Sequence, residues 1–269
     1  MSTFIPEIAA RALMPRELLA DASAMHLCMH AGPGAVCVAV AQAGTTRALW
    51  SQTFATDAGS HDAFHESIQF ILDRNWADKV FRKCTFTFDT LNFCVVPSAL
   101  FERGKEKELL QFHTGKQHKL VQTAALNEMQ AELVYEQMEH YTTLVHRFVN
   151  VRVVAAPALL ARAAHMLSQG ERHCIHIAHH AGQLTLCILH QNQLQLLNAY
   201  QAKSTADVLY FTANAAMQLG IDLENAQLMV HSHHENEELT QLLSDYNRNV
   251  KQAAPTGQSA FTHMHLLCA

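Results

Sequence analysis

Two stretches of this sequence share one pattern: MHLCMHAGPGAVCVAV at residues 25–40 and IHIAHHAGQLTLCILH at residues 175–190. Each stretch has an apolar strand, a turn that contains glycine, and a second apolar strand. At an offset of 150 residues, His30-Ala31-Gly32 falls on His180-Ala181-Gly182 and Cys37 falls on Cys187. We therefore interpret the two stretches as copies of one unit.

The segments around these stretches extend the repeat. Alternation predicts strands at 25–30, 35–42 and 46–54 with a helix at 61–74, then strands at 174–180, 183–189 and 194–202 with a helix at 205–219. Three strands before the first helix disfavour a doubly wound parallel sheet, which needs strand and helix to alternate from the start. The order predicts a mixed α/β fold of the actin-like or ribonuclease-H-like kind, with a duplicated βββα unit. Its halves, 22–170 and 171–269, would face each other across a cleft, with the first hairpin turn of each half pointing into it.

The segment between the two repeats has weaker signals. We expect a hairpin from Thr85–Phe88 and Asn92–Val96, and then a broken helix that starts at Pro97 and runs to about residue 112. The period is ambiguous at 119–123 and 132–135. An amphipathic helix is predicted at 136–148, followed by a strand at 151–155 and a helix from Pro157 to Gly170.

Composition excludes several classes of protein. With 19 Lys+Arg against 24 Asp+Glu, the formal net charge is -5, which argues against a dedicated nucleic-acid binder. The seven cysteines never form a CxxC pair and lie mostly in apolar runs, so they predict small core residues in a reducing compartment. We find no signal peptide at the N-terminus and no stretch of 18 apolar residues. A cytoplasmic protein without a membrane span is the expectation.

Histidine is the unusual residue, because the 19 histidines equal Lys and Arg together. Two interpretations stay open: surfaces that tolerate histidine, which we favour, and a switch driven by protonation near pH 6.5. The clusters at 173–180, 231–234 and 263–265 also invite a metal site. Strand alternation, however, places His176 and His180 on one face and His173 and His179 on the other, so no face collects three ligands and no metal is expected.

Two further motifs resemble a known family. They are Phe93-Cys94-Val95-Val96-Pro97-Ser98-Ala99-Leu100-Phe101, followed by Glu108-Leu109-Leu110-Gln111-Phe112, and Asp207-Val208-Leu209-Tyr210-Phe211 with Gln218-Leu219-Gly220-Ile221-Asp222. Their order and spacing resemble uncharacterised proteins of Bacteroidota, a domain of unknown function with an actin-like fold. The resemblance covers about residues 20–268 and implies the fold without an activity.

In active proteins of actin-like fold, each half carries a phosphate loop in which Asp precedes glycine and holds Mg²⁺. Here the corresponding candidates for a degenerate phosphate site are His30, Gly32 and Gly34 in the first half, and His180 and Gly182 in the second. The glycines are present and the carboxylates are absent. Imidazole replaces an oxygen ligand of Mg²⁺ poorly, and Pro33 lacks an N–H for a phosphate. We expect no ATP hydrolysis and no cofactor, with weak binding of ATP or another anion as the alternative.

Two functional classes follow. The favoured one is a non-catalytic actin-like scaffold or regulatory protein that acts through an unidentified protein partner. Such a role is also compatible with a homodimer. The other is an ATP-binding or kinase-like enzyme that takes its carboxylates from Asp57, Asp89 or Asp207. The sequence has no Gly-x-Ser-x-Gly nucleophile elbow, no P-loop and no His-Glu-x-x-His motif, so these motifs support no other chemistry.

Overall fold

The structure is a computed structural model that describes residues 18, 20–32, 35–55, 79–137, 150–232, 236–255 and 259–268. The expected helix at 61–74 and nearly all of the one at 136–148 lie outside the described residues. Gly34, Asp57, His233 and His234 lie outside them as well.

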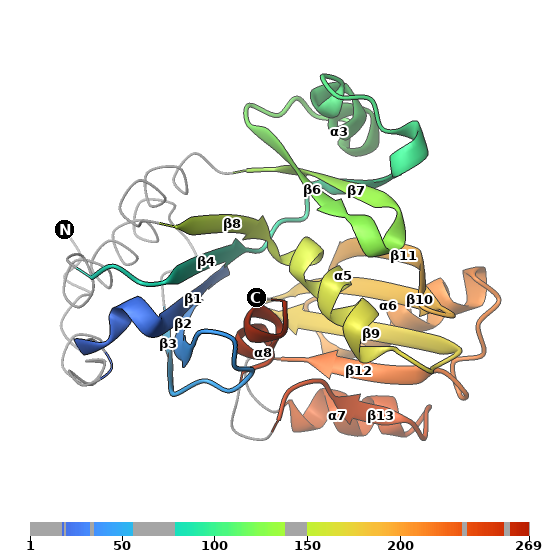
Figure 1. Ribbon diagram of the computed structural model, residues 1–269. Coiled ribbons are helices and arrows are strands. Elements are labelled where there is room, and N and C mark those ends of the chain that lie inside the picture. Colours follow the sequence, from blue (N-terminus) through green and yellow to red (C-terminus); the bar gives the residue numbers. More distant parts are fainter. Residues whose placement is uncertain are drawn as a thin grey trace, which may run out of the picture.

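Two five-stranded sheets form the body of the protein (Figure 1). The first contains β1 (Met25–Gly32), β2 (Ala35–Gln42), β3 (Trp50–Ala55), β4 (Lys83–Phe88) and β8 (Val151–Ala155). The second contains β9 (His173–His180), β10 (Gln183–His190), β11 (Gln193–Gln201), β12 (Gln227–His231) and β13 (Val250–Gln252).

The two sheets have the same topology. The first has the order β3-β2-β1-β4-β8 and the second has the order β11-β10-β9-β12-β13. In each, the first three strands form an antiparallel meander, and the last two continue the sheet in parallel. This confirms the predicted duplicated mixed α/β fold.

The relation between the two copies differs from the sequence alignment. Strands β1 and β9 both have eight residues, as do β2 and β10, and each pair is related by 148 residues (173 − 25 and 183 − 35). The alignment at 150 is therefore wrong by two residues. Because side chains alternate with a period of two, this shift keeps every residue on its face, and apolar pattern alone does not reveal it.

One consequence concerns the first hairpin turn. Ala31 and Gly32 were expected in that turn, but they are the last residues of β1 and pair with Val36 and Ala35. The third strand likewise starts at Trp50 rather than at Thr46. The structural counterpart of Gly32 is His180, the last residue of β9.

Two helices pack between the sheets (Figure 1). Helix α5 (Ala156–Leu167) contacts β4 and β8 as well as β9, β10 and β11, and α8 (Ala260–Leu267) contacts β1, β2 and α5. Pro157 stands in the first turn of α5, where a missing N–H costs no intrahelical bond. The rest of α5 is rich in buried alanine, which lets the strands of both halves approach it.

The second sheet has its own helical layer. Helix α6 (Thr205–Gln218) begins with a capping box in which Ser204 and Asp207 each accept from the other's backbone N–H. It packs with α7 (Glu237–Ser244), and the two helices bury Val208, Ala215, Leu239 and Leu243 in a core with the strands of this sheet.

The remaining strands form a small sheet, and this arrangement corrects one prediction. Strands β5 (Phe93–Pro97), β6 (Val121–Leu126) and β7 (Ala131–Glu136) have the order β5-β7-β6, and α3 (Glu106–Thr114) packs on them. The expected hairpin of 85–88 with 92–96 is wrong, because β4 pairs in parallel with β1 and β8 while β5 pairs with β7. We call residues 93–136 the three-stranded module.

Histidines lie in the interior more than expected. Among the described residues, six histidines are buried: His26, His30, His118, His176, His231 and His265. The interpretation of histidine-tolerant surfaces is therefore wrong for these six. Each has a polar partner within the fold, which offsets the loss of water around the ring. Within the described part of the chain, no helix has the length and apolar character needed to cross a membrane.

Candidate functional site

The two halves meet where β1 and β9 end. A Cβ atom placed on Gly32 would lie 2.6 Å from Oδ2 of Asp89 and 3.0 Å from Cδ2 of His180. Gly32 is not in the left-handed backbone region, so it is needed here for space rather than for turn geometry. The glycine makes room for two side chains of the protein itself.

His30 is fixed at the centre of this contact. Its Nδ1 lies 2.9 Å from Oγ1 of Thr87, and its Nε2 lies 3.4 Å from Oδ2 of Asp89. Its ring also stacks on Phe261 of α8, with centroids 3.8 Å apart. Together these contacts join β1, β4 and α8.

Thr87 extends the network to a second buried histidine. Its Oγ1 lies 2.8 Å from Nε2 of His265 and 2.9 Å from Nδ1 of His30, so one hydroxyl contacts both imidazoles. Burial, together with the neighbouring His30 and His26, lowers the pKa of His265 well below 6.5. A neutral His265 therefore anchors the C-terminal helix to the first sheet.

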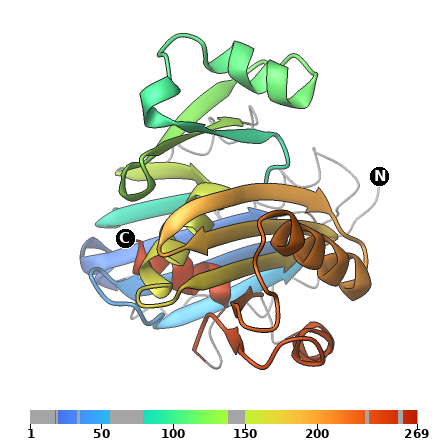
Figure 2. The same cartoon turned by 90° about the vertical axis from the view of Figure 1, so that its right-hand side faces the viewer.

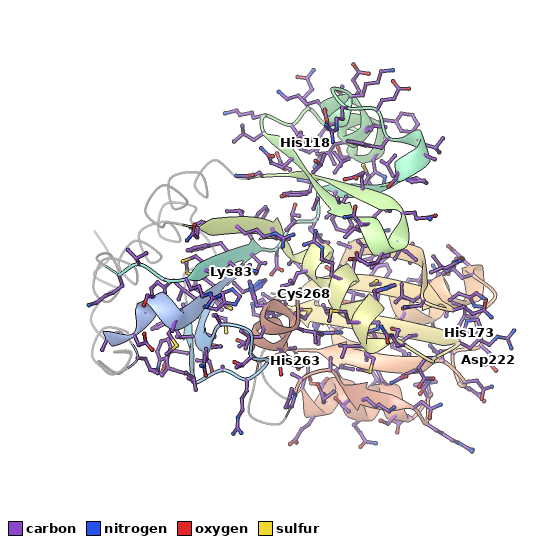
Figure 3. The ribbon with its side chains drawn as sticks, viewed as in Figure 1. Lys83, His118, His173, Asp222, His263 and Cys268 are labelled. Atoms are coloured by element: carbon purple, nitrogen blue, oxygen red, sulfur yellow. The ribbon has the colours of Figure 1, made fainter. Side chains whose placement is uncertain are left out.

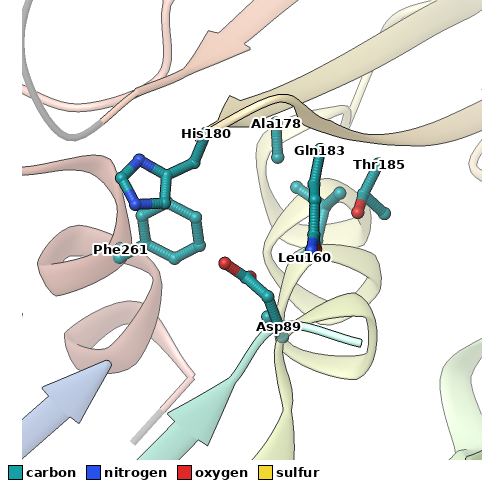
Figure 4. Close-up of a pocket in the computed structure, with 8 residues that line it drawn as sticks. Asp89, Leu160, Ala178, His180, Gln183, Thr185 and Phe261 are labelled. Atoms are coloured by element: carbon teal, nitrogen blue, oxygen red, sulfur yellow. The ribbon is translucent and has the colours of Figure 1, made fainter. Parts of the chain in front are cut away.

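A small cavity remains beside this network (Figure 4). Asp89, His180 and Phe261 line it, together with Gln183, Thr185 and residues of α5. The space open to the centre of a water molecule is ≈ 10 Å³, which suits about one water. Sites for drug-sized ligands measure roughly 300–1,000 Å³. Among the described residues, the contact of Gly32 with Asp89 and His180 is therefore closely packed.

Gly182 shapes the turn between β9 and β10. Ala181 has a φ of 47° and Gly182 a φ of 76°, as the two central residues of a type I′ hairpin turn require. The nearest atom to a Cβ at Gly182 would be the carbonyl oxygen of Ala202, at 3.8 Å, and Gly182 does not line the cavity.

Of the predicted site residues, the structure thus brings together His30, Gly32 and His180, while Gly182 lies apart and Gly34 is outside the described residues. Sequence reasoning missed Thr87 and Phe261, and it considered His265 only for a metal and Asp89 only for an enzyme. Asp89 was placed in the wrong hairpin, and Phe261 and His265 come from the far end of the chain.

A second histidine cluster lies inside the other sheet. Nδ1 of His176 is 2.9 Å from Nε2 of His231, and Nε2 of His176 is 2.8 Å from Oγ of Ser168. Burial lowers the pKa of His176 to about 3 and that of His231 well below 6.5. Both rings are therefore neutral near pH 7 and share one hydrogen bond inside the core.

Other histidines link strands and turns through contacts with polar side chains. His173 lies at the opposite end of β9 from His180, with its Nδ1 3.1 Å from Nδ1 of His190 (Figure 3). In the three-stranded module, His118 contacts Thr114 at 2.7 Å and Glu136 at 3.0 Å. Within the described residues, no group of three or more His, Cys, Asp or Glu side chains is arranged to hold a metal ion.

Solved structures with similar folds include two that cover most of the chain. A protein from Bacteroides thetaiotaomicron VPI-5482, described as having an actin-like ATPase fold and unknown function, has a TM-score of 0.80 and 13% identity. That match covers 96% of this chain and 100% of the other. The PilM-PilN type IV pilus biogenesis complex has a TM-score of 0.50 and 13% identity, with 86% of this chain and 88% of the other covered. At these identities the likeness establishes the actin-like fold alone.

No curated protein matches the chain in sequence. A family described as "Protein of unknown function (DUF3822)" matches residues 18–250. This match spans most of the 269 residues and includes both five-stranded sheets, except for the part of β13 that follows Val250. The chain therefore belongs to the DUF3822 family of proteins of unknown function.

Proposed function

We propose that this chain is a non-catalytic actin-like protein that works as a scaffold or regulatory partner of another protein. One observation carries the proposal: the space between the two facing hairpins holds Asp89, His180 and Phe261, and leaves room for about one water. A nucleotide needs a site many times larger. Within the described part of the chain, the actin-like frame is kept while the space beside Gly32 and His180 is nearly filled by side chains.

Charge supports the same proposal. The carboxylate of Asp89 lies beside Gly32, which is where the resemblance to active actin-like proteins would place a phosphate. A phosphate without a metal ion would meet the partly buried carboxylate of Asp89 there, which opposes anion binding. The weak binding of ATP or another anion that the glycines suggested is thus disfavoured both by space and by charge.

One candidate carboxylate of the enzyme alternative has another role in the structure. Asp207 accepts hydrogen bonds from the backbone N–H groups of Lys203 and Ser204 as part of a helix cap, and it does not line the cavity. Asp57 lies outside the described residues. Asp89 is the carboxylate that would have to hold Mg²⁺ in such an enzyme, with histidines around it in place of further oxygen ligands.

Calorimetric titration with ATP·Mg²⁺ tests the proposal. We expect flat heats and no phosphate release. Binding tighter than about 100 μM together with turnover would contradict the proposal and favour the enzyme. An Asp89→Asn variant separates the two causes, because it removes the charge and keeps the size of the side chain. Heats that stay flat in this variant support closure by packing.

A match to one protein of a pilus complex agrees with a binding role but does not identify a partner. PilM-PilN is a type IV pilus biogenesis complex, so a protein of similar fold works there as part of an assembly. For the present chain, a cytoplasmic location, an unidentified protein partner and a function independent of nucleic acid belong to the same proposal.

A further inference from the structure

The helical layer of the second half holds all of the net negative charge of the chain. Residues 204–247, which include α6, β12 and α7, have seven Asp+Glu and neither Lys nor Arg. The rest of the sequence has 17 Asp+Glu (24 − 7) against 19 Lys+Arg, so its formal charge is +2. Because like charges concentrated on one surface reinforce each other's field, this layer attracts positively charged groups from solution.

Most of these seven carboxylates are exposed without a counter-charge. The five exposed residues are Asp222, Glu224, Glu237, Glu238 and Asp245. Within the described part of the chain, none of the five lies in an ion pair. Of the other two, Asp207 caps α6 and Glu235 lies outside the described residues. A cationic partner would therefore pair with the five without first breaking an ion pair of this chain.

The outer side of α6 carries an apolar stripe. Tyr210 is 64% exposed and Met217 is 71% exposed. The two residues are seven positions apart, which is about two helical turns, so they lie on one face of α6. Ala206 and Ala213 share this face, and their small side chains let a neighbouring chain approach the helix. Exposed apolar side chains that lie in a row mark an interaction site, whereas single ones are ordinary.

Acidic residues stand at both ends of this apolar stripe. At the start of α6, Oγ1 of Thr205 donates to Oε1 of Glu238 at 2.9 Å, which brings the first turns of α6 and α7 together. After the end of α6, Gly220 turns the chain with a φ of 66°, and Asp222 and Glu224 follow. Figure 2 shows α6 and α7 on the outer side of the second sheet. We call the apolar stripe together with the five exposed carboxylates the acidic helical face.

The charge and the apolar stripe together define what the acidic helical face binds. Nucleic acids and anionic lipid surfaces carry negative charge and would be repelled. A second copy of the chain that used the same face would bring its exposed carboxylates against those of the first, which is unfavourable for the same reason. A segment that combines Lys or Arg with apolar side chains gains from both features at once.

We propose that the acidic helical face binds a basic amphipathic helix of a partner protein. The apolar side of that helix would pack on Tyr210 and Met217, and Lys or Arg near its two ends would contact Glu238 and Glu224. A helix fits because the apolar stripe follows helical spacing, and the side chains of two helices interdigitate along such rows. The inference rests on the proposed scaffold role and names the kind of partner that the scaffold holds.

The test uses a display library of random 14-residue peptides, the length of α6, with the full-length chain as the target. We expect the selected peptides to carry a net positive charge, with apolar residues at the i, i+3, i+4 and i+7 spacing of a helix and with Lys or Arg near both ends. Binding of each synthesised peptide is then measured by fluorescence anisotropy. Circular dichroism should show that the peptide gains helix when it binds.

The apolar stripe is tested by Tyr210→Gln, with Phe112→Gln as the matched control. Phe112 is 93% exposed on α3, so its change also removes an exposed aromatic side chain from a helix, but outside the acidic helical face. We expect Tyr210→Gln to weaken peptide binding at least about fivefold and Phe112→Gln to change it less than about twofold. Cooperative thermal unfolding of both variants shows that both fold.

The charge is tested by Glu224→Gln combined with Glu238→Gln. The control pair, Glu108→Gln with Glu128→Gln, removes the same charge from exposed positions of the three-stranded module. Glutamine at 238 keeps an oxygen that accepts from Thr205, so α6 and α7 stay in contact. We expect the first pair to weaken binding about three- to tenfold at about 50 mM salt and to have little effect at about 500 mM, where charges are screened. The control pair should change binding less than about twofold at either salt concentration.

Three results would overturn the inference: no peptide enriched above background, enriched peptides that are acidic or uncharged, or equal binding to the Tyr210→Gln variant. A peptide that binds without gaining helix would also contradict it. A dimer in sedimentation that Tyr210→Gln converts to monomer would overturn it in favour of a second copy. ATP turnover would refute the proposed scaffold role while peptide binding persists. Flat ATP heats without any selected peptide would refute the acidic helical face alone.

Discussion

At the scale of single residues, Gly32 shows how a glycine can join two halves of a protein. A side chain at this position would reach Asp89 and His180 at 2.6 and 3.0 Å, closer than ordinary contacts. We expect Gly32→Ala to lower the free energy of unfolding by about 1–3 kcal/mol, the usual cost of overpacking. Urea denaturation of the full chain measures this loss.

The control for Gly32→Ala is the same change in an Asp89→Ala background. Removing the carboxylate empties the space that the new methyl group would enter, so the alanine should cost less there, and the two changes should not be additive. An equal loss in both backgrounds would show that the close approach to Asp89 is unimportant.

The same residues show what sequence could predict about the site. The glycines and histidines of both repeats were visible as candidates, and three of the five converge. Their role was not visible, because it depends on Asp89, which follows β4, and on Phe261 from α8, and both lie far away along the chain. Side-chain contacts between distant elements leave no local pattern in a sequence.

At the scale of elements, the hairpin of β9 and β10 offers a stabilising change. Ala181 occupies the first central position of a type I′ turn with a φ of 47°, where asparagine is preferred and alanine is strained. We expect Ala181→Asn to raise the free energy of unfolding by about 0.5–1 kcal/mol, measured by urea denaturation. Ala181→Val, with its branched side chain, should lower it.

The opposite ranking of these two variants would mean that the turn is not type I′ in solution. An unchanged stability in both would mean that the hairpin is already open in the native state. Gly182, with a φ of 76°, remains unaltered in both variants, so the comparison isolates the first turn position.

Helices and strands with a clear pattern of apolar and polar residues were predicted well, while the pairing between strands was not. The strands of the second meander and helices α5 and α6 appear close to their expected bounds. The hairpin of 85–96 and the offset of 150 were wrong, because alternation fixes which face a residue takes but not which strand it pairs with. Pairing is set by packing against other elements, such as α5 against β4 and β8.

At the scale of the whole molecule, the buried histidines link stability to pH. Burial lowers the pKa of His26 to about 4 and that of His176 to about 3, while His231 and His265 are also lowered well below 6.5. The unfolded chain binds these protons near pH 6.5 and the folded chain does not. Stability is therefore full above about pH 6.5 and falls as the pH drops from there toward 4.

For His26 alone, the shift of its pKa from 6.5 to about 4 corresponds to a loss in the free energy of unfolding on the order of 3 kcal/mol between these two pH values. We expect the His26→Gln variant to bind up to one proton fewer on unfolding, so that its free energy of unfolding falls less steeply as the pH drops. Glutamine can keep a hydrogen bond to Thr85 without titrating. The exposed His113, changed to Gln, is the matched control and should leave the slope unchanged. Urea midpoints at several values between pH 7.5 and 4.5 give both slopes. A wild-type stability that stays constant down to pH 5 would mean that these histidines are hydrated in solution, because only rings kept from water resist protonation enough to couple folding to pH.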